Sequence, residues 1–119
     1  MRVLLISANT ERINMPTLPL GLALVAGATR QAGHEVCFLD LRAGGDGGVA
    51  IGRAVAEFSP QVIGISVRNI DDQNMACPRF LLDGVREVVA ACRAATAAPV
   101  VLGGAGYSIF PEAALGYLG

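Results

Sequence analysis

The sequence predicts a single α/β domain built on a parallel sheet, and three observations support this class. Four short apolar runs alternate with four stretches of helical periodicity, which is the order that right-handed β–α–β crossovers produce. Connections from helix to strand are short, whereas connections from strand to helix are long. The chain has 119 residues, of which 53% are hydrophobic, so one domain with its own core is expected.

The first half of the chain predicts two strand–helix units. In order, they are Arg2–Ser7, residues 20–32, Glu35–Asp40 and residues 49–58. The first helix follows Pro19, whose missing N–H is harmless there, and ends at Gly33, a typical left-handed cap. Leu22, Val25, Ala26 and Thr29 recur at helical spacing, so we expect them on one face of this helix.

The second half begins with the strand around which the domain is organised, residues 61–69, which contains a β-branched run. Such a run is typical of a central parallel strand covered on both faces. Three further elements are predicted: a helix at 78–95, a strand at 99–103 and a helix at Pro111–Leu118. A fifth strand is expected next, so we interpret the chain as a fragment whose fourth strand is an exposed edge that favours self-association.

The long connections after the strands all belong to one edge of the predicted sheet. They are residues 8–19, 41–48, 68–77 and 104–110. In open α/β sheets, ligands bind at this carboxyl edge. The sequence therefore predicts a ligand site there, centred on the end of the third strand.

Charge and composition exclude several classes of function. The net charge of −1 gives no electrostatic footprint for nucleic acid or an anionic membrane. All nine basic residues are arginine, which excludes Schiff-base chemistry and a phosphate-loop lysine. We find neither 18 consecutive apolar residues nor a signal peptide, and we expect a cytoplasmic protein. The three cysteines form no C-x-x-C pair and are interpreted as free buried thiols.

Several well-known sites are incomplete. The loop after the first strand has no glycine, so a dinucleotide fingerprint is missing and Asp40 is interpreted as a capping or loop-ordering residue. A phosphorelay receiver would need an early acidic pair and a late lysine, and Asp71 and Asp72 follow the wrong strand. His34 lies at the amino edge and is interpreted as a helix cap. No catalytic set is visible, so the domain is expected to bind a ligand rather than transform it alone.

The run Gly103-Gly104-Ala105-Gly106 is the most specific signal. Glycines after a strand let a bulky ligand approach the backbone and offer N–H groups to a phosphate or ribose. We favour this interpretation over a plain turn. On this basis Gly104→Val is expected to block the ligand and to leave the fold largely intact, since the loop is expected at the surface.

Five segments together resemble the cobalamin-binding domain at the N-terminus of cobalamin-dependent radical S-adenosylmethionine enzymes. They are Pro19-Leu20-Gly21-Leu22-Ala23, Ala32-Gly33-His34-Glu35-Val36 with Leu39-Asp40, Val62-Ile63-Gly64-Ile65-Ser66, Val101-Leu102-Gly103-Gly104, and Ser108-Ile109-Phe110-Pro111-Glu112. The resemblance covers nearly the whole chain. It implies a flavodoxin-like (Rossmann-like) three-layer parallel sheet of order 2-1-3-4, with a fifth strand missing from the fragment.

The resemblance also implies where cobalamin is held. Ser66 would meet the nucleotide tail, the glycine run would let that tail lie between strand ends, and residues 7–10 and 67–69 would flank the corrin. The implied cofactor-binding residues are Ser7, Asn9, Thr10, Gly21, Ser66, Val67, Arg68, Asn69, Gly103, Gly104, Ala105, Gly106 and Ser108.

Two departures from related families shape the expected cobalt site. Residues 8–14 replace the D-x-H-x-x-G motif that supplies a histidine to cobalt in methionine-synthase-like domains, and they contain no histidine. Arg68 is the residue best placed beneath the corrin, and a guanidinium has no lone pair to donate. We therefore expect base-off cobalamin without a histidine ligand. The C-x-x-x-C-x-x-C motif is absent too, so a [4Fe-4S] cluster and S-adenosylmethionine would belong to the parent's downstream radical domain.

Two alternatives stay open from the sequence. One is a flavin- or nucleotide-binding flavodoxin-like domain, and the other is a non-catalytic interaction domain that uses the same edge. On the favoured interpretation the partners are cobalamin and the parent's own radical domain, without nucleic acid or membrane. The parent would be an enzyme of methyltransferase or cyclase type.

Overall fold

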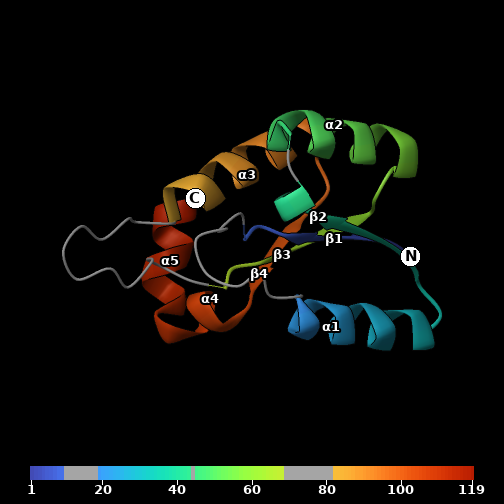
Figure 1. Ribbon diagram of the computed structural model, residues 1–119, viewed down its shortest axis with the longest axis horizontal. Coiled ribbons are helices and arrows are strands. Elements are labelled where there is room, and N and C mark those ends of the chain that lie inside the picture. Colours follow the sequence, from blue (N-terminus) through green and yellow to red (C-terminus); the bar gives the residue numbers. More distant parts are fainter. Residues whose placement is uncertain (10–18, 44, 69–81) are drawn as a thin grey trace.

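A computed structural model of the protein, which describes residues 1–9, 19–43, 45–68 and 82–119, contains a four-stranded parallel sheet between layers of helices (Figure 1). The strands are β1 (Arg2–Ser7), β2 (Glu35–Asp40), β3 (Val62–Ser66) and β4 (Val100–Gly103). Their spatial order is β2-β1-β3-β4, and all three pairings are parallel. This arrangement confirms the predicted α/β class and strand order, with β4 at one edge of the described sheet.

Helices cover the two faces of the sheet unequally. The helical elements are α1 (Leu20–Gln31), the 3-10 turn η1 (Leu41–Ala43), α2 (Gly47–Phe58), α3 (Leu82–Ala95), α4 (Ala105–Ile109) and α5 (Pro111–Leu118). α1 lies on one face, and α2 and α3 pack against each other on the opposite face (Figure 1). We call these the α1 face and the α2–α3 face. No helix in the described part of the chain is long and apolar enough to cross a bilayer.

The α2–α3 face is a closed hydrophobic core. Leu4 and Ile6 of β1 pair in register with Ile63 and Ile65 of β3, and all four side chains are essentially fully buried. They form one cluster with apolar residues of α2 and α3, among them Ile51. Because burying each such side chain is worth about 1.5–3 kcal/mol, this face supplies most of the hydrophobic stabilisation.

The α1 face is only partly covered. Val3 and Leu5 of β1 pack on Leu22 and Ala26 of α1, in a second and smaller cluster. α1 lies over β1 and β2, whereas Val101, which shares this face on β4, is 57% exposed. The sheet therefore presents apolar surface beside α1 rather than beneath it.

Local signals set most helix ends as predicted. Gly33 follows α1 with φ +92°, which confirms the expected left-handed cap. Pro111 is the first residue of α5, a position where its missing N–H is harmless. Asp46 caps α2 by accepting backbone N–H bonds from Gly48 (2.8 Å) and Val49 (3.3 Å), so the helix begins at Gly47, two residues earlier than predicted.

The predicted face of α1 holds the buried Leu22 and Ala26 together with Val25, which is 51% exposed. One prediction about local structure is wrong. The glycine run is not one loop, because Gly104 is the N-cap of the short helix α4, which begins at Ala105. For the predicted helix at 78–95, the structure describes the part from Leu82, and residues 78–81 lie outside the described ranges.

Candidate functional site

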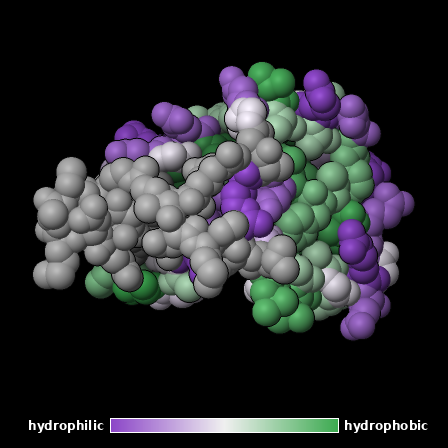
Figure 2. All heavy atoms as spheres, in the orientation of Figure 1, coloured by the Kyte–Doolittle hydropathy of each residue, from purple (hydrophilic) through white to green (hydrophobic). Residues whose placement is uncertain are grey.

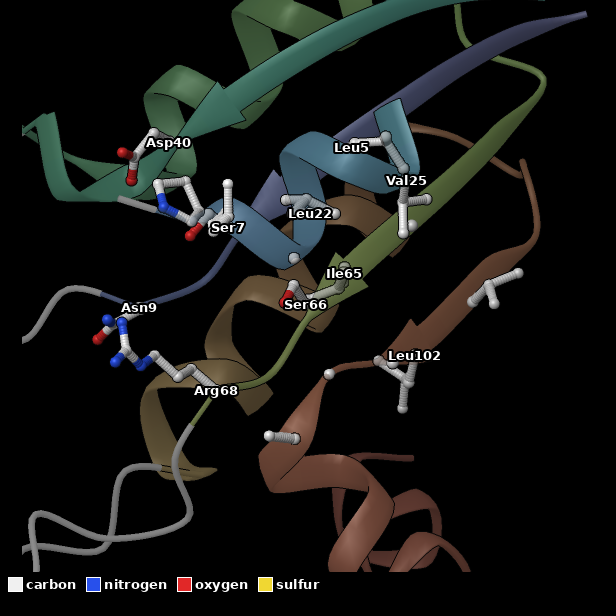
Figure 3. Close-up of a pocket in the computed structure, with 18 of the residues that line it drawn as sticks. Leu5, Ser7, Asn9, Leu22, Val25, Asp40, Ile65, Ser66, Arg68 and Leu102 are labelled. Atoms are coloured by element: carbon white, nitrogen blue, oxygen red, sulfur yellow. The ribbon is translucent and has the colours of Figure 1, made fainter. Parts of the chain in front are cut away.

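A cavity of about 880 Å³ lies on the α1 face and reaches the carboxyl edge of the sheet (Figure 3). One wall is the inner side of α1, and the floor is the surface of the strands that α1 leaves uncovered. Its main apolar residues are Leu5, Leu22, Val25, Val62, Val101 and Leu102. The exposure of Val25 and Val101 is thus explained, since both side chains are cavity walls.

A polar row crosses the cavity floor at the ends of the strands. Ser7 of β1 pairs in register with Asp40 of β2 and with Ser66 of β3, and Ser66 pairs with Gly103 of β4. Side chains that pair in register point to the same face, so this row continues the α1 face. With strands about 4.8 Å apart, the row spans roughly 14 Å. We call Asp40, Ser7, Ser66 and Gly103 the polar row.

The two hydroxyls of the polar row border the cavity. Ser7 is 5% exposed, and it is the buried polar residue of the described core. Neither Ser7 nor Ser66 hydrogen-bonds another described residue through its hydroxyl, and no described buried side-chain atom is left unsatisfied. Both hydroxyls therefore turn their donor and acceptor sites to the cavity rather than to the protein.

Gly103 and Gly104 have different structural roles although they are adjacent. A Cβ added to Gly103 would meet nothing within 4 Å, so Gly103 keeps the cavity wall open. Gly104 has φ +99°, and its Cβ would lie 2.5 Å from the backbone oxygen of Val67. The close approach is set by hydrogen bonds from Val67 N–H to Gly103 O (2.7 Å) and from Gly106 N–H to Val67 O (2.9 Å).

This geometry corrects the expected effect of Gly104→Val. The side chain would collide with the protein's own backbone and would need a left-handed conformation that valine rarely adopts. The substitution would therefore disturb the β3–β4 junction itself. Gly103 is the position where a side chain enters the cavity without touching its neighbours.

Asn9 and Arg68 lie at the mouth of the cavity. Both line it, and in Figure 3 their side chains point toward the same region beyond the ends of β1 and β3. Arg68 is exposed and carries a guanidinium group. A positive charge therefore marks the entrance where the corrin was expected.

Asp40 orders the turn after β2, as its sequence context indicated. Its Oδ1 accepts the backbone N–H of Arg42 at 3.0 Å, and its Oδ2 lies 3.7 Å from Nη2 of the same arginine. Asp40 and Arg42 also line the cavity, which the sequence analysis missed. The signal was available in the strand register, because Asp40 ends β2 at the level where Ser7 ends β1.

The structure brings together most of the residues that the resemblance implied. Those that line the cavity are Ser7, Asn9, Gly21, Ser66, Arg68, Gly103, Gly104 and Ala105. Val67 does not, because its side chain is buried in the α2–α3 core. Gly106 is buried within α4, and the Ser108 hydroxyl donates to Gly104 O of its own helix at 2.9 Å. Thr10 and Asn69 lie outside the described residues.

Most of the cavity-lining residues that sequence reasoning missed are those of the apolar walls. Leu5, Val62 and Val101 alternate along their strands with residues of the closed core, so the α1 face could be assigned once strand register was known. Gly64 belongs to the same face, and a Cβ there would lie 2.8 Å from Cδ2 of Leu5. A larger residue at position 64 would therefore fill the floor.

The described side chains at the cavity do not form a metal site. The cavity lining contains neither histidine nor cysteine, and no cluster of metal-ligating groups exists among the described residues. Burial raises the pKa of the Cys92 thiol to about 11, on the opposite face of the sheet. His34 lies at the amino edge, as predicted, where its Nδ1 is 3.3 Å from the N-terminal amine.

Comparison with known proteins gives three related findings. The sequence profile of the family described as "B12 binding domain" matches residues 6–119. Tryptophan 2-C-methyltransferase from Streptomyces laurentii is 33% identical over 112 residues, which are 93% of this chain and 19% of that protein. The radical S-adenosylmethionine methyltransferase TsrM from Kitasatospora setae, solved with cobalamin and a [4Fe-4S] cluster bound, superposes with a TM-score of 0.90. It is 34% identical, and the match covers 98% of this chain and 20% of TsrM. The chain thus spans about a fifth of the length of these relatives.

Proposed function

The chain belongs to the B12-binding domain family and is a cobalamin-binding module, and from this premise we propose that it holds cobalamin in the cavity beside α1. The observation that carries the proposal is the uncovered part of the α1 face, which combines apolar walls with the polar row. The nucleotide tail would lie along the floor between α1 and β4. The corrin would then rest at the carboxyl edge, near Asn9 and Arg68.

The residues present fit this group. A cavity of about 880 Å³ lies within the range of ligand pockets, roughly 300–1,000 Å³. Leu22, Val25 and Val101 give apolar walls for a flat aromatic base, and the Ser7 and Ser66 hydroxyls are placed for polar links of the tail. Gly21 and Gly103 each border open space, so neither wall narrows the slot.

We propose that cobalamin is held base-off and without a histidine ligand. The described lining offers neither histidine nor cysteine, and the only histidine of the sequence is at the amino edge, roughly 17 Å away for a strand of ordinary length. The base-off state follows if the tail occupies the slot beside Ser66. Arg68 at the mouth would place a charge, rather than a ligand, near the lower face of the corrin.

The parent protein is proposed to be a longer radical S-adenosylmethionine enzyme, with this chain as its N-terminal cobalamin-binding domain. Both relatives are methyltransferases by name, which favours a methyltransferase over a cyclase. Bound cobalamin would supply the group-transfer chemistry, while this chain binds and orients it. The [4Fe-4S] cluster, S-adenosylmethionine and the catalytic residues would belong to the downstream radical domain. A cytoplasmic location is part of the same proposal.

The outer edge of β4 is proposed as a surface for β-strand pairing, with self-association as its consequence. β4 ends the described sheet and carries the exposed Val101. Free strand edges recruit other strands. Sedimentation of the protein over a range of concentrations tests this: dimers or larger species are expected, and a monomer at every concentration contradicts it.

A titration tests the cobalamin proposal against a flavin site. The absorption spectrum of hydroxocobalamin is expected to shift to a base-off form and to saturate with the protein, whereas flavin mononucleotide shows no saturable change. Gly103→Val is expected to weaken cobalamin binding at least tenfold, because its side chain enters the slot without a clash elsewhere. Ala32→Val, in the exposed turn after α1, serves as a matched surface control. Saturable flavin binding, or no cobalamin binding, would overturn the proposal.

A further inference from the structure

Asp40 is the acidic side chain of the cavity lining in the described part of the chain. It stands at the β2 end of the polar row, in register with Ser7. Its side chain is 27% exposed, so it is partly withdrawn from water. Figure 3 shows its carboxylate beyond the end of β2, on the same side of the sheet as Ser7. The group therefore faces whatever occupies this side of the cavity.

The contacts with Arg42 orient the carboxylate without using its full capacity. A carboxylate offers about four acceptor positions. Oδ1 accepts one backbone N–H at 3.0 Å, and Oδ2 is 3.7 Å from a guanidinium nitrogen, too far for a hydrogen bond. Acceptor positions therefore remain on both oxygens. The short η1 turn holds the group in place, so little conformational freedom would be lost when a donor binds.

A fixed carboxylate in a largely apolar cavity selects its neighbour by charge and by hydrogen-bonding type. It favours a group that donates N–H or O–H, and it repels phosphate and carboxylate groups. Cobalamin has neutral donors of this kind in two parts, the side-chain amides around the corrin and the ribose hydroxyls of the nucleotide tail. We propose that Asp40 is a further cobalamin-binding residue that accepts a hydrogen bond from one of these neutral donors. This inference rests on the proposed function of the cavity.

The test compares four proteins: wild type, Asp40→Ala, Asp40→Asn and Glu35→Ala. Glu35 lies on the same strand, is exposed, and is at the amino end, roughly 17 Å from Asp40. Its substitution makes the same change in net charge and should leave affinity unchanged. Asp40→Ala is expected to weaken hydroxocobalamin binding by about tenfold to a hundredfold, the usual loss for a charge-assisted hydrogen bond. Asp40→Asn keeps an acceptor for Arg42 N–H and is expected to weaken binding severalfold.

Dissociation constants from absorbance titrations, with circular dichroism to verify folding, give the outcome. Titration with cobinamide, which keeps the corrin carboxamides but lacks the nucleotide tail, identifies the donor. If the Asp40→Ala loss persists with cobinamide, the donor is a corrin side-chain amide; if it disappears, the donor is a ribose hydroxyl. Wild-type affinity in Asp40→Asn, or equal affinities for Asp40→Ala and Glu35→Ala, overturns the inference. Absence of binding by the wild type would instead overturn the proposed function.

Discussion

The two faces of one sheet have opposite roles in this protein, although the same strands build both. On the α2–α3 face, β1 and β3 present Leu4, Ile6, Ile63 and Ile65 to two helices, and these side chains are fully or almost fully buried. On the α1 face the same strands present smaller or polar residues beside a single helix, and a cavity of about 880 Å³ remains. Stability thus comes mainly from one face, and we propose that the ligand binds on the other.

The comparison shows how alternation along a strand separates these roles. Each residue on the binding face can change without altering the residue packed behind it, because successive side chains point in opposite directions. Gly64 lies between Ile63 and Ile65 and illustrates this point. Its neighbours are closed in the core, while its own missing side chain leaves room for Leu5 on the cavity floor, since an added Cβ would lie 2.8 Å from Leu5 Cδ2.

The largest difference in the free energy of unfolding is expected between Ile63→Ala and Val101→Ala. Ile63 is fully buried on the closed face, so its truncation is expected to lower the free energy of unfolding by about 2–5 kcal/mol. Val101 is exposed on the α1 face, and its truncation should cost under about 0.5 kcal/mol. Urea unfolding of both variants measures the difference. Similar losses of stability would show that the α1 face is packed like the other.

A second contrast uses the adjacent glycines at the end of β4. Gly104→Ala is expected to destabilise the protein by about 1–3 kcal/mol, because it combines a left-handed φ with a Cβ 2.5 Å from Val67 O. Gly103→Ala meets no neighbour and should leave the unfolding free energy nearly unchanged. Thermal and urea unfolding of the two variants give the comparison. A stable Gly104→Ala variant would contradict the close backbone contact between β3 and α4.

A smaller effect concerns the Cys92 thiol, which is buried in the closed core. Its pKa is raised from 9.0 to about 11 by burial, so the folded state keeps the proton when the unfolded state has lost it. This contribution to stability is complete below pH 9 and is lost as pH rises from 9 to 11. Between pH 8 and pH 10 the loss is expected to be about 1 kcal/mol.

Urea unfolding of wild type and Cys92→Ala at the two pH values isolates the thiol. Cys92→Ala should be less stable than wild type at pH 8, because it leaves a small cavity, but its stability should change less between pH 8 and pH 10. An equal pH dependence in the two proteins would show that the thiol ionises as readily in the folded state as in the unfolded chain.

The α/β class, the helix caps at Gly33 and Pro111 and the expected place of the site at the carboxyl edge followed from sequence patterns, whereas the strand order came from the family resemblance. Periodicity and turn residues are local signals, so they can be read without knowing which strands pair. The cavity walls and the place of Asp40 in the lining could be identified only from strand register, which depends on how two segments pair. The need for glycine at position 104 could be recognised only from the tertiary structure, because the backbone of Val67, 37 residues earlier, leaves no room for a Cβ there. Composition alone did not distinguish it from Gly103.

Electron paramagnetic resonance of the protein with Co(II) cobalamin tests whether the nucleotide tail leaves cobalt for the slot beside α1. We predict base-off cobalt without a nitrogen ligand, because the tail occupies the slot beside Ser66 and the described lining contains no histidine. The cobalt signal should therefore show no nitrogen superhyperfine splitting, in wild type and in His34→Ala alike. Splitting that disappears in His34→Ala would identify a histidine ligand. Splitting that persists in that variant would place the benzimidazole on cobalt and leave the slot beside α1 without its proposed occupant. Either result would contradict the account.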